Sequence, residues 1–280
     1  MVAEAALDPF AVAAQTVRRH DPDRYLADLF IPEEGRRHVL ALHAFNAEVA
    51  RVRDAVSEPA LGEIRLQWWR DALAGDDGGH PIARALKQTI GAFNLPIDAL
   101  ERLIDARAFD LYDDAMPTLN DLEGYAGETS SSLIQMAAIV LAGGRDPDTA
   151  AAAGHAGVAT AITGLLRALP VHARRGQQYL PRDLMANHGA DAAAMFEGRT
   201  TDGLRAVLAE LRARARQHVA AARQALAGAP SDAKAAFLPM ALVEPYLKHM
   251  ERRACDPLGT PVALPPWQRP WVLWRAARTF

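Results

Sequence analysis

The amino-acid sequence predicts an all-α fold, and three features of its 280 residues support that prediction. Half of the residues are apolar but only 6% are aromatic, and the strong helix former Ala dominates the apolar share. Apolar residues recur at steps of three and four, the spacing of one helix face. No run shows the alternating, β-branched pattern of a strand. We therefore expect residues 1–280 to form a single helical domain around a long apolar core.

Turn signals divide the chain into helix-length pieces. Asp8-Pro9 predicts a helix start in the N-terminal helical region 1–20, because the acid can cap and proline suits the first turn. Pro239 and Pro245 predict kinks in a late helix. The expected helices cover, in order, residues 9–20, 21–29, 32–56, 61–73, 81–93, 97–112, 119–141, 149–169, a short stretch from 181, 201–227, 232–253 and 271–278.

The last residues differ in composition from the rest. Residues 256–280 are expected to form a proline-rich strap followed by a docked C-terminal helix. Trp267, Trp271 and Trp274 are interleaved with arginines, a mixture that suits a lipid headgroup interface and a peripheral membrane contact. Alternatively, the Trp side chains pack onto the body and the arginines face solvent. Association with anionic vesicles that is lost on truncation after Ala263 would distinguish the two.

Charge and cysteine content exclude several classes. The net charge of −3, from 31 basic and 34 acidic residues, gives no bulk attraction to nucleic acid. Cys255 is the single cysteine, so no intrachain disulfide can form and a reducing compartment is expected.

Residues 1–10 lack the basic region of a signal peptide, and apolar stretches such as 133–142 fall short of the roughly 18 residues that span a bilayer. We expect a cytoplasmic protein, or one peripheral on the inner membrane.

Common catalytic motifs are missing from the sequence. It contains no P-loop, GxGxxG, HExxH, GxSxG or paired-cysteine motif, and its nine histidines lack metal-ligand spacing. The sequence therefore gives no support to a phosphate-cradling loop or a zinc hydrolase.

Three polar segments interrupt the apolar helices. In the first, Arg51, Asp54 and Glu58 would share one side of a helix, either as a solvated salt-bridged stripe or as a polar face lining a cavity. In the second, residues 67–71, one of two adjacent Trp is expected in the core and the other in a groove. The third, residues 167–181, gathers arginines and a histidine near a helix end. These residues either cap the helix and form a basic loop, or they form an anion-binding site.

These segments, in this order, resemble the squalene/phytoene synthase family. The residues that carry the resemblance are 25–32, 41–54, 67–71 and 173–176 leading to Tyr179-Leu180-Pro181, and the similarity runs from about Arg24 to Arg278. The resemblance implies an isoprenoid-synthase fold with a central cavity, where two prenyl diphosphates are joined head to head. It also implies two aspartate-rich motifs on facing helices whose Mg²⁺ ions hold the diphosphates and remove the leaving group.

The sequence departs from the family pattern at both motifs. The first, Asp-Asp-x-x-Asp, falls on Ala50, Arg51 and Asp54, so one acid remains. The second, Asn-x-x-x-Asp-x-x-x-Asp, falls on Gly164, Ala168 and His172, so none of its three metal-side residues remains. Mg²⁺ is usually held by one or two carboxylates together with phosphate oxygens and water. Asp54 alone could support at best one weak ion, and we expect the standard coupling reaction to be lost.

Residues 125–133 and 165–175 resemble one branch of the family, the mitochondrial respiratory complex I assembly factor and its bacterial relatives. This resemblance implies a role in building complex I, with complex I subunits as partners. The lost acids indicate a pseudoenzyme without a cofactor, which acts either in that assembly or as a binder of an isoprenoid or lipid-like ligand in the cavity. Arginine can pair with phosphate without a metal. The candidate anion contacts are Arg51, Arg53, Arg167, His172, Arg174, Arg175 and Tyr179.

The alternative is an active head-to-head prenyl diphosphate transferase with an altered metal site. Its candidate catalytic acids are Asp54, Glu58 and Glu48, with Asp71 or Glu128 in support, and it would require Mg²⁺.

Overall fold

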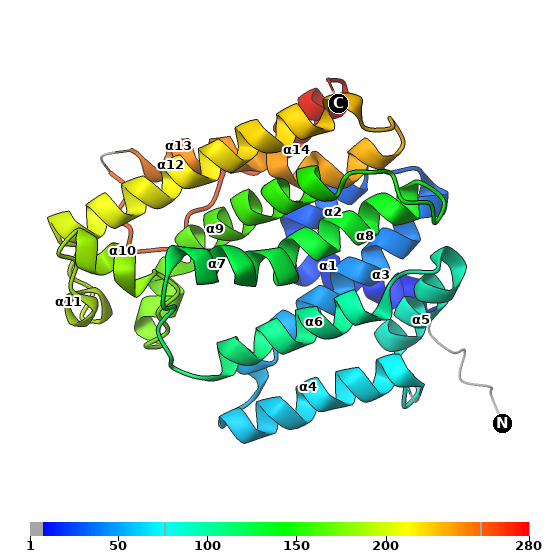
Figure 1. The fold of residues 1–280 in the computed structure, drawn as a ribbon, viewed down its shortest axis with the longest axis horizontal. Coiled ribbons are helices and arrows are strands. Elements are labelled where there is room, and N and C mark those ends of the chain that lie inside the picture. Colours follow the sequence, from blue (N-terminus) through cyan, green and yellow to red (C-terminus); the bar gives the residue numbers. More distant parts are fainter. Residues whose placement is uncertain (1–7, 76, 253, 280) are drawn as a thin grey trace.

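The computed structural model describes residues 8–75, 77–252 and 254–279, and its regular structure is helical throughout, with no strand among these residues. This confirms the predicted all-α class. Two long helices, α9 (Ala150–Arg174) and α12 (Asp202–Ala225), run side by side along the molecule (Figure 1). The other helices are α1 (Pro9–His20), α2 (Pro22–Asp28), α3 (Glu33–Ala50), α4 (Pro59–Ala74), α5 (Pro81–Phe93), α6 (Ile97–Arg107), α7 (Leu119–Ala126), α8 (Ser132–Leu141), α10 (Arg182–Asn187), α11 (Ala192–Phe196), α13 (Val243–Met250) and α14 (Gln268–Ala277). Shorter helical segments are η1 (Arg53–Ala55), η2 (Ala108–Leu111), η3 (Gly127–Ser131), η4 (Leu226–Gly228) and η5 (Ala233–Leu242).

Helices with strong local start signals lie where the sequence predicts them. α1 covers Pro9–His20, and the Asp8 side chain accepts a hydrogen bond from the Phe10 backbone N–H. α5 covers Pro81–Phe93 and ends at Asn94, whose left-handed φ of 51° is common at helix C-termini. Predicted features at residues 1–7, Arg253 and Phe280 lie outside the described residues.

The helix predicted over residues 32–56 is shorter in the structure. α3 ends at Ala50, and Glu58 is extended, with φ −133° and ψ 144°. The residue before a proline avoids the helical region, and Pro59 follows Glu58 directly. The prediction that Arg51, Asp54 and Glu58 share one helix side is therefore wrong.

The helix predicted over 119–141 contains a π-helical segment. η3 (Gly127–Ser131) separates α7 from α8 and packs closely on α9 at Gly157. A Cβ on Gly157 would lie 2.2 Å from Ser131 Oγ, so only glycine permits this approach. Such π segments are frequent at functional sites, and this one places Thr129 and Ser130 on the wall of a cavity.

The core has two parts. The larger part includes the buried α3 residues that the periodicity predicts, among them Leu42 and Phe45. The smaller part lies beneath the C-terminal segment and includes Leu238, Tyr246 and Leu273.

The central helix α9 extends five residues beyond its predicted end and continues through Pro170 to Arg174. By length and composition it could cross a membrane, contrary to our expectation for the apolar stretches. It packs against α12, η3 and α8, and this core position accounts for its apolar composition.

Candidate functional site

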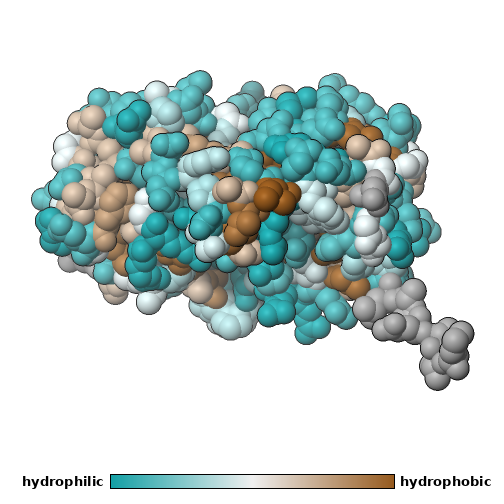
Figure 2. Space-filling view, turned by 90° about the horizontal axis from the view of Figure 1, so that it is seen from below, coloured by the Kyte–Doolittle hydropathy of each residue, from teal (hydrophilic) through white to brown (hydrophobic). Residues whose placement is uncertain are grey.

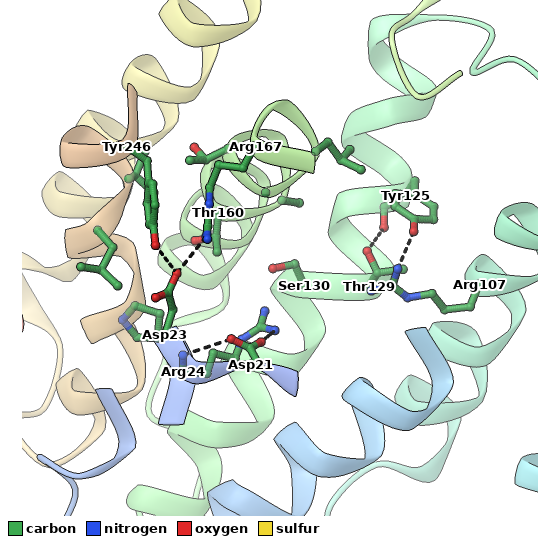
Figure 3. Close-up of a pocket in the computed structure, with 17 residues that line it drawn as sticks. Asp21, Asp23, Arg24, Arg107, Tyr125, Thr129, Ser130, Thr160, Arg167 and Tyr246 are labelled. Atoms are coloured by element: carbon green, nitrogen blue, oxygen red, sulfur yellow. Dashed lines mark hydrogen bonds and ion pairs between the residues drawn. The ribbon is translucent and has the colours of Figure 1, made fainter. Parts of the chain in front are cut away.

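A cavity of about 240 Å³, lined by both polar and apolar side chains, lies between α2, η3, α9 and α13 (Figure 3). Its volume is below the roughly 300–1,000 Å³ of typical small-molecule pockets. The family motif position Gly164 borders it, and so does one predicted anion contact, Arg167. The other polar lining residues are Asp21, Asp23, Arg24, Arg107, Tyr125, Thr129, Ser130, Thr160, Thr163 and Tyr246.

Asp23 organises one wall of the cavity (Figure 3). Its Oδ2 accepts hydrogen bonds from Arg167 Nη1 at 2.8 Å and from the Tyr246 hydroxyl at 2.7 Å. Arg269 Nη1, from α14, lies 3.1 Å from its other oxygen. The Arg167 guanidinium also lies 3.7 Å from the Tyr246 ring centroid, a cation–π contact. One carboxylate therefore joins α2, α9, α13 and α14.

The opposite wall presents a hydroxyl without a protein partner. Ser130 is 4% exposed, and its Oγ has no hydrogen-bond partner among the described residues. Neighbouring Thr129 donates to the Tyr125 carbonyl at 2.7 Å, so its hydroxyl is already used. A buried polar group without a partner costs roughly 1–3 kcal/mol. Ser130 Oγ and Arg107 Nε are the two buried side-chain atoms without a partner among the described residues that line this cavity, so both would gain from a polar ligand.

A buried network around Asp110 supports the same wall. Asp110 is 6% exposed and accepts hydrogen bonds from Tyr125 at 2.8 Å, Tyr179 at 2.7 Å and Arg107 at 3.0 Å. Burial, together with the charge of Asp110, raises the pKa of Tyr179. Tyr179 was a predicted anion contact, but its hydroxyl proton is already donated to Asp110. Sequence reasoning missed Asp110, and its place between Phe109 and Leu111 gave only a weak signal because other charged residues lie close by in the sequence.

The remaining acid of the first motif contacts the end of α9, just beyond the second motif. Asp54 forms an ion pair with Arg175, which follows α9. The neighbouring His172 ring lies 4.6 Å from the Tyr179 ring, and burial lowers the pKa of His172 to about 4, so its imidazole is neutral.

The donor set at this contact does not fit Mg²⁺, which prefers oxygen ligands. The one remaining carboxylate, Asp54, already has a cationic partner in Arg175. Across the described part of the chain, no three His, Cys, Asp or Glu side chains gather where they could hold a metal ion.

The other arginines that were predicted as anion contacts bind different partners in separate parts of the fold. Arg51 Nη1 lies 3.0 Å from His20 Nε2, and Arg53 lies 3.6 Å from Asp113. Arg174 donates to the Gly259 carbonyl at 3.3 Å. The structure therefore does not bring these arginines together with Arg167.

The candidate catalytic acids also engage different partners. Glu48 lies 3.8 Å from Arg51, Glu128 lies 3.4 Å from Arg102, and Asp71 accepts from Gln67 at 2.8 Å. Glu58 stands at the start of α4.

The paired Trp residues behave as predicted. Trp69 is 5% exposed and contacts Phe45, while Trp68 lines a surface groove beside Arg51 and His80.

Comparison with known proteins identifies the family. The squalene/phytoene synthase family model matches residues 17–275. "NADH dehydrogenase (ubiquinone) complex I, assembly factor 6" of Rattus norvegicus is 35% identical over 249 residues, 88% of this chain and 74% of the relative. "Phytoene synthase" of Thermus thermophilus is 28% identical over 280 residues, 97% of this chain and 94% of the relative.

Solved structures of the same fold superpose well. Squalene synthase HpnC from Alicyclobacillus acidocaldarius gives a TM-score of 0.76 at 23% identity and covers 88% of this chain and 94% of its own. A dehydrosqualene synthase in complex with ligand gives 0.84 at 18% identity and covers 97% and 95%. These similarities confirm the predicted isoprenoid-synthase architecture.

Proposed function

This chain belongs to the squalene/phytoene synthase family, and we propose that it is a non-catalytic member that assists the assembly of respiratory complex I. The observation that carries the proposal is the pairing of Asp54 with Arg175 where the family chemistry needs clustered Mg²⁺. Gly164 and Ala168 add no ligand, and His172 adds a neutral imidazole. The role in complex I assembly is proposed from the relatives that are named for it.

The proposal includes a ligand in the cavity, with complex I subunits as partners on the cytoplasmic side of the inner membrane. Leu165, Leu242 and Val243 offer apolar wall, and Arg24, Arg107 and Arg167 offer guanidinium groups that are each already paired with an acid. Arg107 Nε and Ser130 Oγ have no partner and are left to hydrogen-bond the polar end of an isoprenoid or lipid-like molecule. The cavity volume of about 240 Å³ favours a head group over a pair of prenyl chains.

The alternative, an active prenyl diphosphate transferase, draws on the similarity to phytoene synthase. It needs Asp54, Glu58 and Glu48 to converge on one ion. Asp54 and Glu48 instead face Arg175 and Arg51, which weakens the alternative.

Gene deletion in the host tests the proposal. We expect deletion to reduce assembled complex I and its NADH:quinone oxidoreductase activity, while succinate dehydrogenase activity, the control, is unchanged. Complementation with Asp54→Ala should restore complex I as fully as the unmodified gene, because no metal chemistry is needed. Normal complex I in the deletion strain would contradict the proposal.

A further inference from the structure

The C-terminal helix α14 is oriented with its aromatic side outward. Trp267, Trp271 and Trp274 are 69%, 51% and 42% exposed, whereas Leu273 is fully buried. Arg269 points inward and pairs with Asp23. The Trp side chains therefore do not pack onto the body, and they face solvent together with Arg275 and Arg278. Exposing this much aromatic surface is unfavourable in water and typical of an interaction site.

The exposed residues form one continuous stripe. Positions 267, 271, 274 and 278 follow steps of four, three and four, so they lie on one side of the helix. The Trp271 and Trp274 rings stack at 5.2 Å, and the Arg278 guanidinium lies 4.8 Å from the Trp274 ring. Trp267 and Trp271 also line an open hollow of about 490 Å³ together with Arg223 and Arg275.

The charge of this face is locally positive. Residues 268–277 contain no acid, although the whole chain carries a net charge of −3. Trp side chains favour the headgroup level of a bilayer, and nearby arginines are attracted to anionic lipids. We propose that the Trp face of α14, defined as Trp267, Trp271, Trp274, Arg275 and Arg278, docks the protein on the surface of a bilayer that contains anionic lipids.

A second exposed apolar patch has different chemistry. Leu61 and Ile64 of α4 are 46% and 66% exposed. Exposed hydrophobic residues lie among hydrophilic ones on the face seen in Figure 2 as well. This patch is aliphatic, and the acid Glu63 and the base Arg65 flank Ile64. It lacks the combination of Trp and Arg, so it serves as a matched control surface.

Membrane docking goes beyond the proposed function and depends on it only for the choice of membrane. The test uses vesicles without any complex I subunit, so its failure and that of the assembly role are distinguishable. Truncation after Ala263 would also remove the buried Leu264 and Leu273. Side-chain substitutions therefore test the face more cleanly than truncation does.

The experiment is cosedimentation of the full chain with vesicles of phosphatidylcholine alone or mixed with phosphatidylglycerol. We expect association with the mixed vesicles that weakens at high salt. Combined Trp267→Ala, Trp271→Ala and Trp274→Ala should weaken it at least about tenfold. Leu61→Ser with Ile64→Ser should leave it unchanged.

A second variant keeps every Trp, in case the triple substitution disturbs folding. Arg275→Gln with Arg278→Gln should reduce the preference for anionic vesicles by about fivefold per residue. Circular dichroism melting checks that each variant is folded. Absence of association by the unmodified protein, or equal binding by the folded Trp and Arg variants, would overturn the proposal. A dimer that is lost with the Trp face would overturn it in favour of self-association.

Discussion

Arg175, which follows α9, forms an ion pair with Asp54, the only acid that remains of the first family motif. The two segments that would hold metal ions between them in an active synthase are here joined directly by opposite charges. Both side chains are substantially exposed, 47% for Arg175 and 42% for Asp54. Because exposed ion pairs contribute little, this pair adds little to stability.

Substitution of Asp54 or Arg175 by Ala should change the free energy of unfolding by less than about 1 kcal/mol, because exposed ion pairs contribute little. Denaturant unfolding of the single and double variants measures the change and the coupling. Millimolar Mg²⁺ should leave the melting temperature of the unmodified protein unchanged. A rise with Mg²⁺ that disappears in Asp54→Ala would show that a metal binds there.

Asp110→Ala should destabilise the fold strongly, by about 3–5 kcal/mol, because it leaves Arg107 buried without its carboxylate. Tyr179→Phe removes one hydrogen bond to Asp110 and should cost about 1–2 kcal/mol. Asp113→Ala, three residues away and 69% exposed at its side chain, is the control and should change stability by less than about 0.5 kcal/mol. Similar values for Asp110→Ala and Asp113→Ala would rule out a structural role for the network.

Acidification should destabilise the protein partly through His172. Burial lowers its pKa in the folded state from 6.5 to about 4, so the unfolded chain binds the proton first as the pH falls. Stability is fully present above about pH 6.5 and is lost toward pH 4, by up to roughly 3 kcal/mol for this group. His172→Gln should flatten this part of the curve of unfolding free energy against pH. Parallel curves for the two proteins would show that His172 does not contribute.

Two glycines of α9 form a matched pair. A Cβ on Gly157 would lie 2.2–2.4 Å from Ser131, including its backbone, whereas a Cβ on Gly154 meets nothing within 4 Å. Gly157→Ala should therefore lower the free energy of unfolding by about 1–3 kcal/mol. Gly154→Ala should raise it by about 0.5–1 kcal/mol, because alanine favours the helix. Thermal melts of both variants measure the difference, and equal shifts would contradict the close packing of η3 on α9.

Local sequence signals predicted well where the helices lie, but poorly how the helices end and pack against one another. Asp8-Pro9 and His80-Pro81 mark helix starts within a few residues, so α1 and α5 follow from the sequence. The end of α3 at Ala50 was missed because the apolar spacing continues to Val56 while the chain turns before Pro59.

The cavity and the Asp110 network depend on contacts between distant segments. Tyr179 reaches Asp110 across 69 positions, and Arg167 reaches Asp23 across 144. Of the predicted anion contacts, only Arg167 lines the cavity. Helical spacing places the three Trp of α14 on one side, but only packing shows that this side faces outward.

A Mg²⁺-dependent prenyl-coupling assay tests most directly whether this chain is non-catalytic. The purified protein is incubated with labelled farnesyl and geranylgeranyl diphosphates beside an active phytoene synthase. A variant with acids restored at Ala50, Arg51, Ala168 and His172 is assayed in parallel. We predict no coupled product from the unmodified protein under conditions in which the active enzyme turns over. Mg²⁺-dependent product that disappears in Asp54→Ala would contradict the non-catalytic assignment and show an active prenyltransferase.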